Sequence, residues 1–251
     1  MSTRNDKTAL ITGGGSGIGL ATAMAFARRG YRVCIADLNL PAATQAAEAI
    51  AELGGEALPL QVDIGDPTSV AALFERLRKE FTRLDAAFNN AGVGGNALPL
   101  AEIEEDDWAR CLQINLSGAW RCLKHEIRWM LDSGGGAIVN NCSIFGLVGG
   151  SNACYTAAKH GIAGLTKSAA LSYAASGIRV NAVCPGLIES GMGLRVLQRA
   201  AERAQDVIGL HPVGRVGTPD EVANAVLWLC SADASFVHGH MLNIDGGYCA
   251  R

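Results

Sequence analysis

Tyr155 and Lys159 are the two residues whose types and spacing most directly indicate chemistry. Residues four apart on a helix lie on one face, one turn apart, so the phenol and the ammonium group are neighbours. A cation beside a phenol stabilises the phenolate and lowers the tyrosine pKa from about 10 towards working pH. Such a tyrosine can exchange a proton with an alcohol. Taken alone, this spacing is more often a surface pair, so its weight comes from the surrounding sequence.

A glycine-rich run from Thr12 to Gly19 lies between an apolar strand-type segment, 7–11, and a helical pattern, 20–30. Glycines permit a tight strand-to-helix turn whose backbone approaches a ligand closely. The N-terminus of the following helix adds free N–H groups and a positive dipole end. This arrangement predicts a pyrophosphate site, and the alternative is a glycine turn without a ligand. The predicted site consists of Gly13, Gly15, Ser16, Gly17, Ile18 and Gly19.

Asp37 ends the second predicted strand, 31–36. A carboxylate at this place can accept hydrogen bonds from both hydroxyls of an adenosine ribose. The sequence favours NAD over NADP, because a 2′-phosphate would face this negative charge and neither Ser16 nor Leu38 supplies a compensating Arg or Lys. The alternative is an ordinary turn residue at a strand end.

Strand and helix patterns alternate along the chain, which predicts an α/β, Rossmann-type doubly wound parallel sheet of about seven strands with helices on both faces. Residues 1–251 are expected to form a single domain, and the irregular segment 189–212 is expected to be a substrate lid. Ligands should bind beyond the carboxyl ends of the strands. The predicted strands are 7–11, 31–36, 56–62, 84–88, 137–143, 178–183 and 241–244.

Other polar residues fall at the same strand ends. Asp63 is expected to accept from an adenine amino group while Ile64 packs on the ring, although Asp63 could instead cap the next helix, a role for which Asp66 competes. Asn89 and Asn90 are expected to tie strands together through their amides while the backbone touches the cofactor. Asn115 lies within a long helical pattern, 103–131, where it could mark a kink.

The bulk composition limits the partners of the chain. A net charge of −3 without any basic run argues against nucleic acid or a membrane surface. Residues 1–7 lack the apolar core of a signal peptide, and no window has the length of a transmembrane helix, so a cytoplasmic protein is expected. The eight cysteines show no metal-ligand spacing and are expected to be buried thiols. His238 and His240 lack a third ligand nearby, and no metal site is expected.

With these residues in view, the chain resembles the single-domain, NAD-dependent branch of the short-chain dehydrogenase/reductase family over nearly all of its length. The matching elements are Thr12-Gly13 to Gly19, Asp63, Asn89-Asn90-Ala91-Gly92, Asn115, Ser143, Tyr155 with Lys159, and Pro185-Gly186. Two departures are visible. The interval from Ser143 to Tyr155 is one residue shorter than in many members, and Ser190 replaces a threonine that many members carry.

The resemblance implies a role for each matching residue. Tyr155 would be the general acid/base, and Lys159 would lower its pKa and bind the nicotinamide ribose. Ser143 would hydrogen-bond the substrate oxygen, and Asn115 would hold a water that links Lys159 to solvent. Ile188 would meet the nicotinamide carboxamide through its backbone, with Ser190 nearby.

The resulting hypothesis is an enzyme that transfers a hydride reversibly between NAD and a secondary, possibly cyclic, alcohol or its ketone. The alternatives are a 3-oxoacyl-thioester (acyl-carrier-protein) reductase, a sugar dehydrogenase, or a non-catalytic NAD-binding sensor. The two-faced helical pattern at 103–131 and the family resemblance indicate a homo-oligomer, expected to be a homotetramer. The mostly apolar substrate pocket is expected to include Phe145, Leu147, Val148, Asn152, Cys154, Leu187, Met192 and Leu194.

Overall fold

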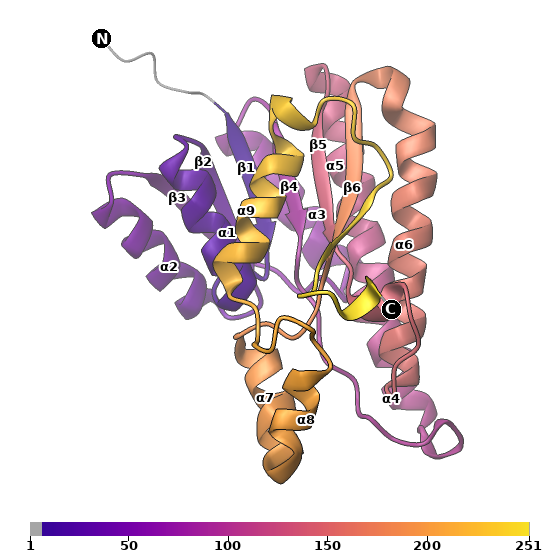
Figure 1. Ribbon diagram of the computed structural model, residues 1–251. Helices are drawn as coiled ribbons and strands as arrows, with labels where there is room; N and C mark the ends of the chain where they lie inside the picture. Colours follow the sequence, from indigo (N-terminus) through magenta and orange to yellow (C-terminus); the bar gives the residue numbers. More distant parts are fainter. Residues whose placement is uncertain (1–6, 251) are drawn as a thin grey trace.

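The computed structural model describes residues 7–250 as one domain built on a seven-stranded parallel sheet (Figure 1). The expectation about a targeting segment falls almost entirely on residues 1–6, which lie outside the described residues. The strands are β1 (Thr8–Thr12), β2 (Arg32–Asp37), β3 (Glu56–Gln61), β4 (Ala86–Asn89), β5 (Gly136–Asn141), β6 (Ile178–Pro185) and β7 (Met241–Ile244). The helices are α1 (Gly17–Arg28), α2 (Leu40–Glu52), α3 (Pro67–Glu80), α4 (Glu105–Leu112), α5 (Ala119–Ser133), α6 (Ala153–Tyr173), α7 (Gly191–Ala200), α8 (Ala204–Gly209) and α9 (Pro219–Cys230).

The strands lie in the order β3-β2-β1-β4-β5-β6-β7. The chain therefore adds β2 and β3 on one side of β1. It then returns and adds β4, β5, β6 and β7 in order on the other side. This reversal confirms the doubly wound arrangement. Thr12 pairs with Asn89 at the carboxyl ends of β1 and β4, where the reversal opens a crevice.

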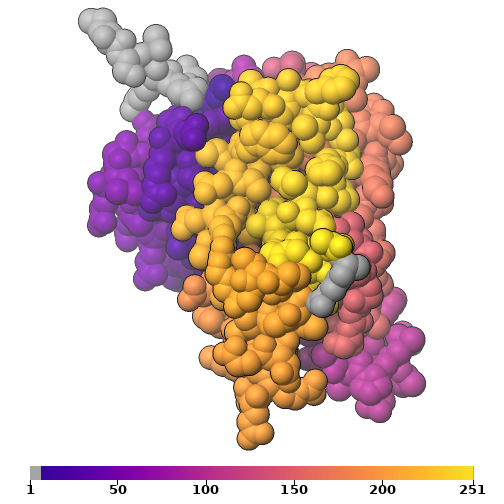
Figure 2. Space-filling model, viewed as in Figure 1, coloured from indigo at the N-terminus to yellow at the C-terminus, as the bar shows by residue number. Residues whose placement is uncertain are grey.

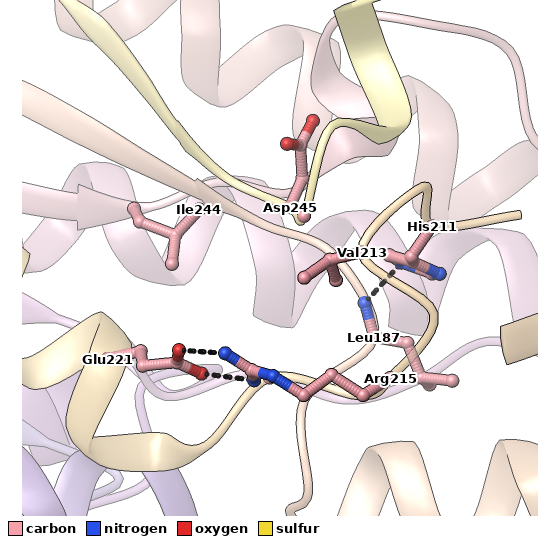
Figure 3. Close-up of a pocket in the computed structure, with 9 residues that line it drawn as sticks. Leu187, His211, Val213, Arg215, Glu221, Ile244 and Asp245 are labelled. Atoms are coloured by element: carbon pink, nitrogen blue, oxygen red, sulfur yellow. Dashed lines mark hydrogen bonds and ion pairs between the residues drawn. The ribbon is translucent and has the colours of Figure 1, made fainter.

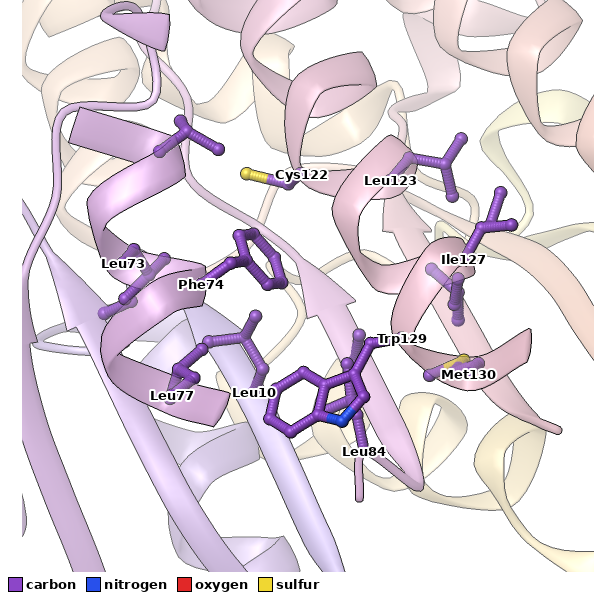
Figure 4. Packing of buried hydrophobic residues seen from close by; sticks show 14 of the residues in the cluster. Leu10, Leu73, Phe74, Leu77, Leu84, Cys122, Leu123, Ile127, Trp129 and Met130 are labelled. Carbon is purple, nitrogen blue, oxygen red and sulfur yellow. The ribbon is translucent and has the colours of Figure 1, made fainter. Parts of the chain in front are cut away.

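Each face of the sheet is covered by its own apolar core. One core joins the sheet to α3, α5 and α6, and the other joins it to α1, α2 and α9. Figure 4 shows the first core, where Phe74 of α3 and Trp129 of α5 pack towards Leu10 of β1. Burying each such side chain stabilises the fold by roughly 1.5–3 kcal/mol. Two-sided burial explains why the central strands read as continuous apolar runs.

The pattern at 103–131 forms two helices, α4 and α5, joined by a π-helical segment, Gln113–Gly118. Asn115 lies inside this segment, so the expected irregularity is present as a π turn. The outer face of α5 carries exposed apolar residues, with Trp120 and Leu131 each 45% exposed. Among the described residues, no helix is both long and apolar enough to span a membrane.

The segment 189–212 is more regular than the sequence indicates. It contains α7 and α8, which project beyond the carboxyl ends of the strands (Figures 1 and 2). Ser190 starts α7 by accepting a hydrogen bond from the Gly193 N–H at 3.4 Å.

Glu126 is a fully buried carboxyl group on α5, beneath β4 and β5. Its Oε2 accepts from Asn89 Nδ2 at 2.8 Å, and the same amide donates to Asn140 Oδ1 at 3.1 Å. Its Oε1 has no hydrogen-bond partner among the described residues. Burial, the largest cause, raises the pKa of Glu126 to about 8, while the Asn89 hydrogen bond acts in the opposite direction.

We expect Glu126→Gln to stabilise the protein at pH 8 and to have little effect at pH 5. The folded carboxyl keeps its proton up to about pH 8, whereas an unfolded one releases it above about 4.3. Stability therefore falls as pH rises through this window, and glutamine removes that loss. Thermal unfolding should show a gain of about 5 °C at pH 8, a few kcal/mol for a chain of this size. Glu48→Gln, on the exposed face of α2, is the control, and an equal gain at both pH values would contradict this assignment.

Candidate active site

The glycine turn after β1 has the backbone geometry that an anion site needs. Gly13 and Gly17 have positive φ angles of 63° and 52°. A β-carbon on Gly19 would collide with the Gly13 carbonyl and lie 2.7 Å from Asn90 Nδ2, so only glycine lets α1 start this close to β1. Ser16, the N-cap of α1, makes no side-chain cap, and the first turn holds no acidic residue. The N–H groups at this helix end are therefore available to an anion.

Asp37 lies at the end of β2, against the glycine turn. Its Oδ2 accepts from the Gly15 N–H at 2.9 Å, and its Oδ1 accepts from the Asn39 N–H at 2.9 Å. Each carboxylate oxygen keeps a second lone pair for a further donor. The next residue, Leu38, is 64% exposed. Position 38 therefore carries an apolar side chain and not a basic one that could pair with a 2′-phosphate.

Asn90 connects the glycine turn to the centre of the sheet. Its Nδ2 donates to the carbonyls of Thr12 at 3.1 Å and Gly13 at 3.0 Å, and its Oδ1 accepts from Asn141 Nδ2 at 2.9 Å. The N–H groups of Asn90 and Ala91 both donate to Thr12 Oγ1. The expectation that these asparagine side chains tie strands together is confirmed, and carbonyls are the backbone groups left for a ligand here.

Ser143, Tyr155 and Lys159 come from the end of β5 and the first turns of α6. Lys159 is 5% exposed, its Nζ donates to the Asn141 carbonyl at 2.6 Å, and it lies 5.4 Å from the centre of the Tyr155 ring. Ser143 Oγ accepts from the Phe145 N–H at 3.2 Å, so its own proton remains available to a substrate oxygen. Asn152 caps α6 by accepting from the Tyr155 N–H at 3.2 Å, which places Tyr155 in the first turn of that helix.

The side chain of Asn115 is fully engaged with its own protein. Its Oδ1 accepts from the Val93 N–H at 2.9 Å, and its Nδ2 donates to the Val93 carbonyl at 3.0 Å and to Cys111 Sγ at 3.3 Å. A β-carbon on Gly92 would lie 2.6 Å from Asn115 Oδ1, which accounts for that glycine. The π turn interrupts the regular backbone ladder, so a backbone carbonyl rather than the side chain is the group that can hold a water.

Asp63 and Ile64 are neighbours in the chain, but Asp63 is exposed and Ile64 is buried. Asp66 caps α3, accepting from the N–H groups of Thr68 and Ser69 at 3.0 and 3.2 Å, which leaves Asp63 exposed at the end of the sheet. Ile64 is only 5% exposed and packs under Gly118 in the core. These contacts do not test the expected packing of its side chain on an adenine ring, which stays a prediction.

Pro185 ends β6, and the loop after it carries Gly186, Ile188 and Ser190. Ser190 lies beside Gly17, where a β-carbon would be 3.2 Å from the Ser190 Cβ. The Gly186 N–H donates to the Ile244 carbonyl at 3.0 Å, which anchors the loop to β7. Ile188 pairs with Gly217 as an isolated parallel bridge.

The residues expected to touch substrate do not all share one cavity. Met192 of α7 lies opposite Gly94, with its sulfur 3.9 Å from where a β-carbon would stand, so α7 meets the loop after β4. Phe145 contacts Tyr248 edge-on at 6.5 Å between ring centres. Leu187 instead lines a separate pocket with His211, Val213, Arg215, Glu221 and Asp245 (Figure 3). No member of the Ser143, Tyr155 and Lys159 group lines that pocket.

Two cysteines lie directly behind this group. Cys142 precedes Ser143, and its thiol contacts the Lys159 carbonyl at 3.2 Å. The Cys184 thiol hydrogen bond lowers the pKa of Cys142 to about 7 against the effect of burial, with Lys159 acting in the same direction. The same bond and burial raise the pKa of Cys184. The expectation of buried free thiols is confirmed for seven of the eight cysteines, and Cys249 is partly exposed.

Three residues near the site were not identified from the sequence as site residues: Thr12, His211 and Tyr248. Thr12 belongs to the glycine run, but its hydroxyl role depends on the β1–β4 pairing. His211 and Tyr248 belong to no recognisable motif, and their rings lie 5.2 Å apart beside the loop after β6. Only the tertiary structure places them there.

Comparison with known proteins agrees with this geometry. A family model described as enoyl-(acyl carrier protein) reductase matches residues 13–249. Cyclohexanol dehydrogenase of Acinetobacter sp. (strain SE19) is 42% identical over 248 residues, 98% of this chain and 96% of that one. Cis-4-hydroxycyclohexanecarboxylate dehydrogenase of Sinomonas cyclohexanicum is 45% identical over 248 residues, 98% of this chain and 97% of that one.

The chain belongs to the short-chain dehydrogenase/reductase family. The crystal structure of levodione reductase superimposes with a TM-score of 0.95 at 34% identity, covering 99% of each chain. Solved relatives of this family include an NAD⁺-bound xylitol dehydrogenase (35% identity, 98% of this chain and 100% of that one, TM-score 0.93). They also include an actinorhodin polyketide ketoreductase with NADPH (33% identity, 99% of each chain, TM-score 0.94). The family therefore binds NAD(P).

Proposed function

We propose that this protein catalyses the reversible, NAD-dependent oxidation of a cyclic secondary alcohol to its ketone. Its relatives make it an oxidoreductase that acts on the CH–OH group of secondary alcohols. The observation that carries the proposal is the hydrogen-bonded connection from Lys159, beside Tyr155, through Asn141 and Asn90 to the glycine turn. Several relatives are named for alcohols of cyclohexane or cyclohexadiene rings, which supports a cyclic substrate for this chain.

The described residues fit a dinucleotide at each of its parts. The free N–H groups of the glycine turn and α1 would hold the pyrophosphate. Asp37 would accept from the adenosine ribose hydroxyls, and Asp63 is exposed where the adenine amino group would lie. The Ile188 backbone and the Ser190 hydroxyl would hold the carboxamide end. When bound, NAD supplies the nicotinamide ring that accepts the hydride.

The chain's own residues would supply orientation and proton transfer. Tyr155 would take the hydroxyl proton of the alcohol as a general base, and return it in the reverse direction. The Lys159 ammonium, held by the Asn141 carbonyl, would stabilise the phenolate and bind the nicotinamide ribose. Ser143 would donate a hydrogen bond to the substrate oxygen. A carbonyl of the π turn at Asn115 would hold a water that connects Lys159 to solvent.

The substrate would lie under α7 and α8. We propose that the segment 189–212 is a lid, because Met192 of α7 reaches the loop at Gly94, and the next residue, Gly95, packs against Asn152 at the start of α6. Phe145, Met192 and the apolar side of Asn152 would line the cavity. Leu187 is left out of this set because it lines the separate pocket beside His211.

Three alternatives predict different features. A 3-oxoacyl-thioester reductase is expected to use NADPH and basic residues near the entrance, and a non-catalytic sensor is expected to have lost part of the catalytic group. Asn115, Ser143, Tyr155 and Lys159 are all present, and Asp37 disfavours a 2′-phosphate. A sugar dehydrogenase would require more polar side chains around Phe145 and Met192.

We expect a strong preference for NAD over NADP, measured as the ratio of kcat/KM values. Asp37→Ala should lower the NAD-to-NADP ratio of kcat/KM values by at least about tenfold, because the repulsion of the 2′-phosphate is removed. Affinity for both cofactors should also fall, since the Gly15 N–H loses its acceptor. Asp63→Ala, which faces the adenine end, is the control and should leave the ratio unchanged. Equal turnover of the two cofactors by the unmodified protein would contradict the role of Asp37.

Tyr155→Phe should remove almost all turnover while leaving NADH binding nearly intact. The ring still packs in place, but loss of a positioned acid/base group typically costs about 10²–10⁴ in rate. Lys159→Ala should reduce both turnover and NADH binding, because Lys159 serves the phenolate and the ribose. Fluorescence titration with NADH beside steady-state oxidation of cyclohexanol separates these effects. A Tyr155→Phe protein that kept more than about a tenth of the activity would show that another group transfers the proton.

We also propose a cytoplasmic homotetramer. The free cysteines suit a reducing compartment. Trp120 on α5, Trp228 on α9 and Phe236 are 45%, 40% and 99% exposed, which leaves apolar surface on two separate sides for subunit contacts. Light scattering at micromolar concentration should give four times the chain mass of 26.1 kDa. A monomer in that measurement would contradict this proposal.

A further inference from the structure

His211 is a buried histidine at the end of the lid segment. It follows α8 and is 4% exposed. Its Nε2 accepts a hydrogen bond from the backbone N–H of Leu187 at 3.0 Å (Figure 3). A ring nitrogen that accepts carries no proton, so the proton of the neutral ring is on Nδ1. Nδ1 itself has no partner among the described residues.

The neighbours of His211 fix its ring in this place. A β-carbon on Gly186 would lie 2.7 Å from Nε2 and 3.0 Å from Cδ2, so His211 can approach the loop only because residue 186 is glycine. The Tyr248 ring is 5.2 Å away on the C-terminal turn. The backbone N–H of His211 donates to the Ile208 carbonyl at 2.9 Å, which ties the residue to the end of α8.

The bond to His211 is one of two bonds that fix the backbone of Leu187 and so decide which way Ile188 faces. The Leu187 carbonyl accepts from the Gly217 N–H at 2.9 Å, and the Glu189 N–H donates to the Gly217 carbonyl at 2.8 Å. These bonds flank Ile188 and form its parallel bridge with Gly217. Backbone groups of successive extended residues point in opposite directions. The Leu187–Ile188 peptide is planar and trans, so the Gly217 bond to the Leu187 carbonyl turns the Ile188 N–H to the other side of the loop. The His211 bond holds the preceding Gly186–Leu187 peptide, so the backbone of Leu187 is fixed on both sides.

We propose that His211 is a positioning residue that, together with Gly217, fixes the backbone of Leu187 from which the Ile188 N–H points, and with it the binding of the nicotinamide carboxamide. This inference rests on the proposed function, because it assigns the Ile188 backbone to NAD. It also connects the lid to the cofactor, since His211 belongs to the lid segment and its acceptor bond ends on the loop. His211 does not touch the reacting atoms.

The test compares His211→Leu with His211→Gln. Leucine fills similar space but cannot accept from the Leu187 N–H, whereas the glutamine amide oxygen reaches about as far as Nε2. Titration calorimetry would measure binding of NADH and of ADP-ribose, which lacks the nicotinamide ring. His238→Gln, at an exposed histidine, is the matched control. Unfolding curves confirm that each variant is folded.

We expect His211→Leu to weaken NADH binding about tenfold and to leave ADP-ribose binding within about twofold, and we expect His211→Gln to restore most of the NADH affinity. An equal loss for both ligands, or no loss for NADH, would overturn the inference. If the unmodified protein bound neither ligand, the proposed function itself would fail. If it bound both and His211→Leu bound NADH equally well, only the role of His211 would fail.

A second measurement needs no cofactor. In protein labelled with ¹⁵N in its histidine rings, His211 should show a protonated Nδ1 and an unprotonated Nε2 at neutral pH, and its signals are identified by their loss in His211→Gln. In His211→Leu, amide exchange at Leu187 should be at least tenfold faster than in the unmodified protein. The opposite tautomer, or unchanged exchange, would overturn the assignment.

Discussion

One hydrogen-bonded relay connects the two halves of the site. Asn90 holds the carbonyls of the glycine turn and accepts from Asn141, and the Asn141 carbonyl in turn accepts from Lys159 beside Tyr155. The ends of β1, β4 and β5 are thereby fixed with respect to one another. Because a proton acceptor and a hydride acceptor must be placed within fractions of an ångström of the alcohol, this relay is the constraint on which the rest of the site depends.

The glycines and the loops follow from that constraint. Gly19 lets α1 begin against Gly13, Gly92 lets Asn115 reach Val93, and Gly186 lets His211 reach Leu187. In each case a polar group must approach where a β-carbon would stand. The segment 189–212 is held to the loop after β6 by His211, beside the Ile188–Gly217 bridge.

The sequence predicted the fold and most of the site because their signals are local. Strand-helix alternation predicted the sheet, and the spacing of Tyr155 and Lys159 predicted their shared helix face. The missed features depend on contacts between distant segments. The side chain of Ile64 packs in the core against Gly118, and the backbone N–H of Leu187 donates to His211, and no local pattern reveals either contact. Asn115 was found, but its amide is occupied by Val93 because the chain folds the loop after β4 onto it.

The central claim is that a hydride passes directly from the carbinol carbon of a cyclic secondary alcohol to NAD in this site. Cyclohexanol carrying deuterium on its carbinol carbon, incubated with NAD and the protein, tests it most directly by mass spectrometry of the NADH formed. The account predicts NADH heavier by one mass unit, with cyclohexanone as the other product. NADH without deuterium, or no NADH from any member of a panel of cyclic alcohols, would contradict it.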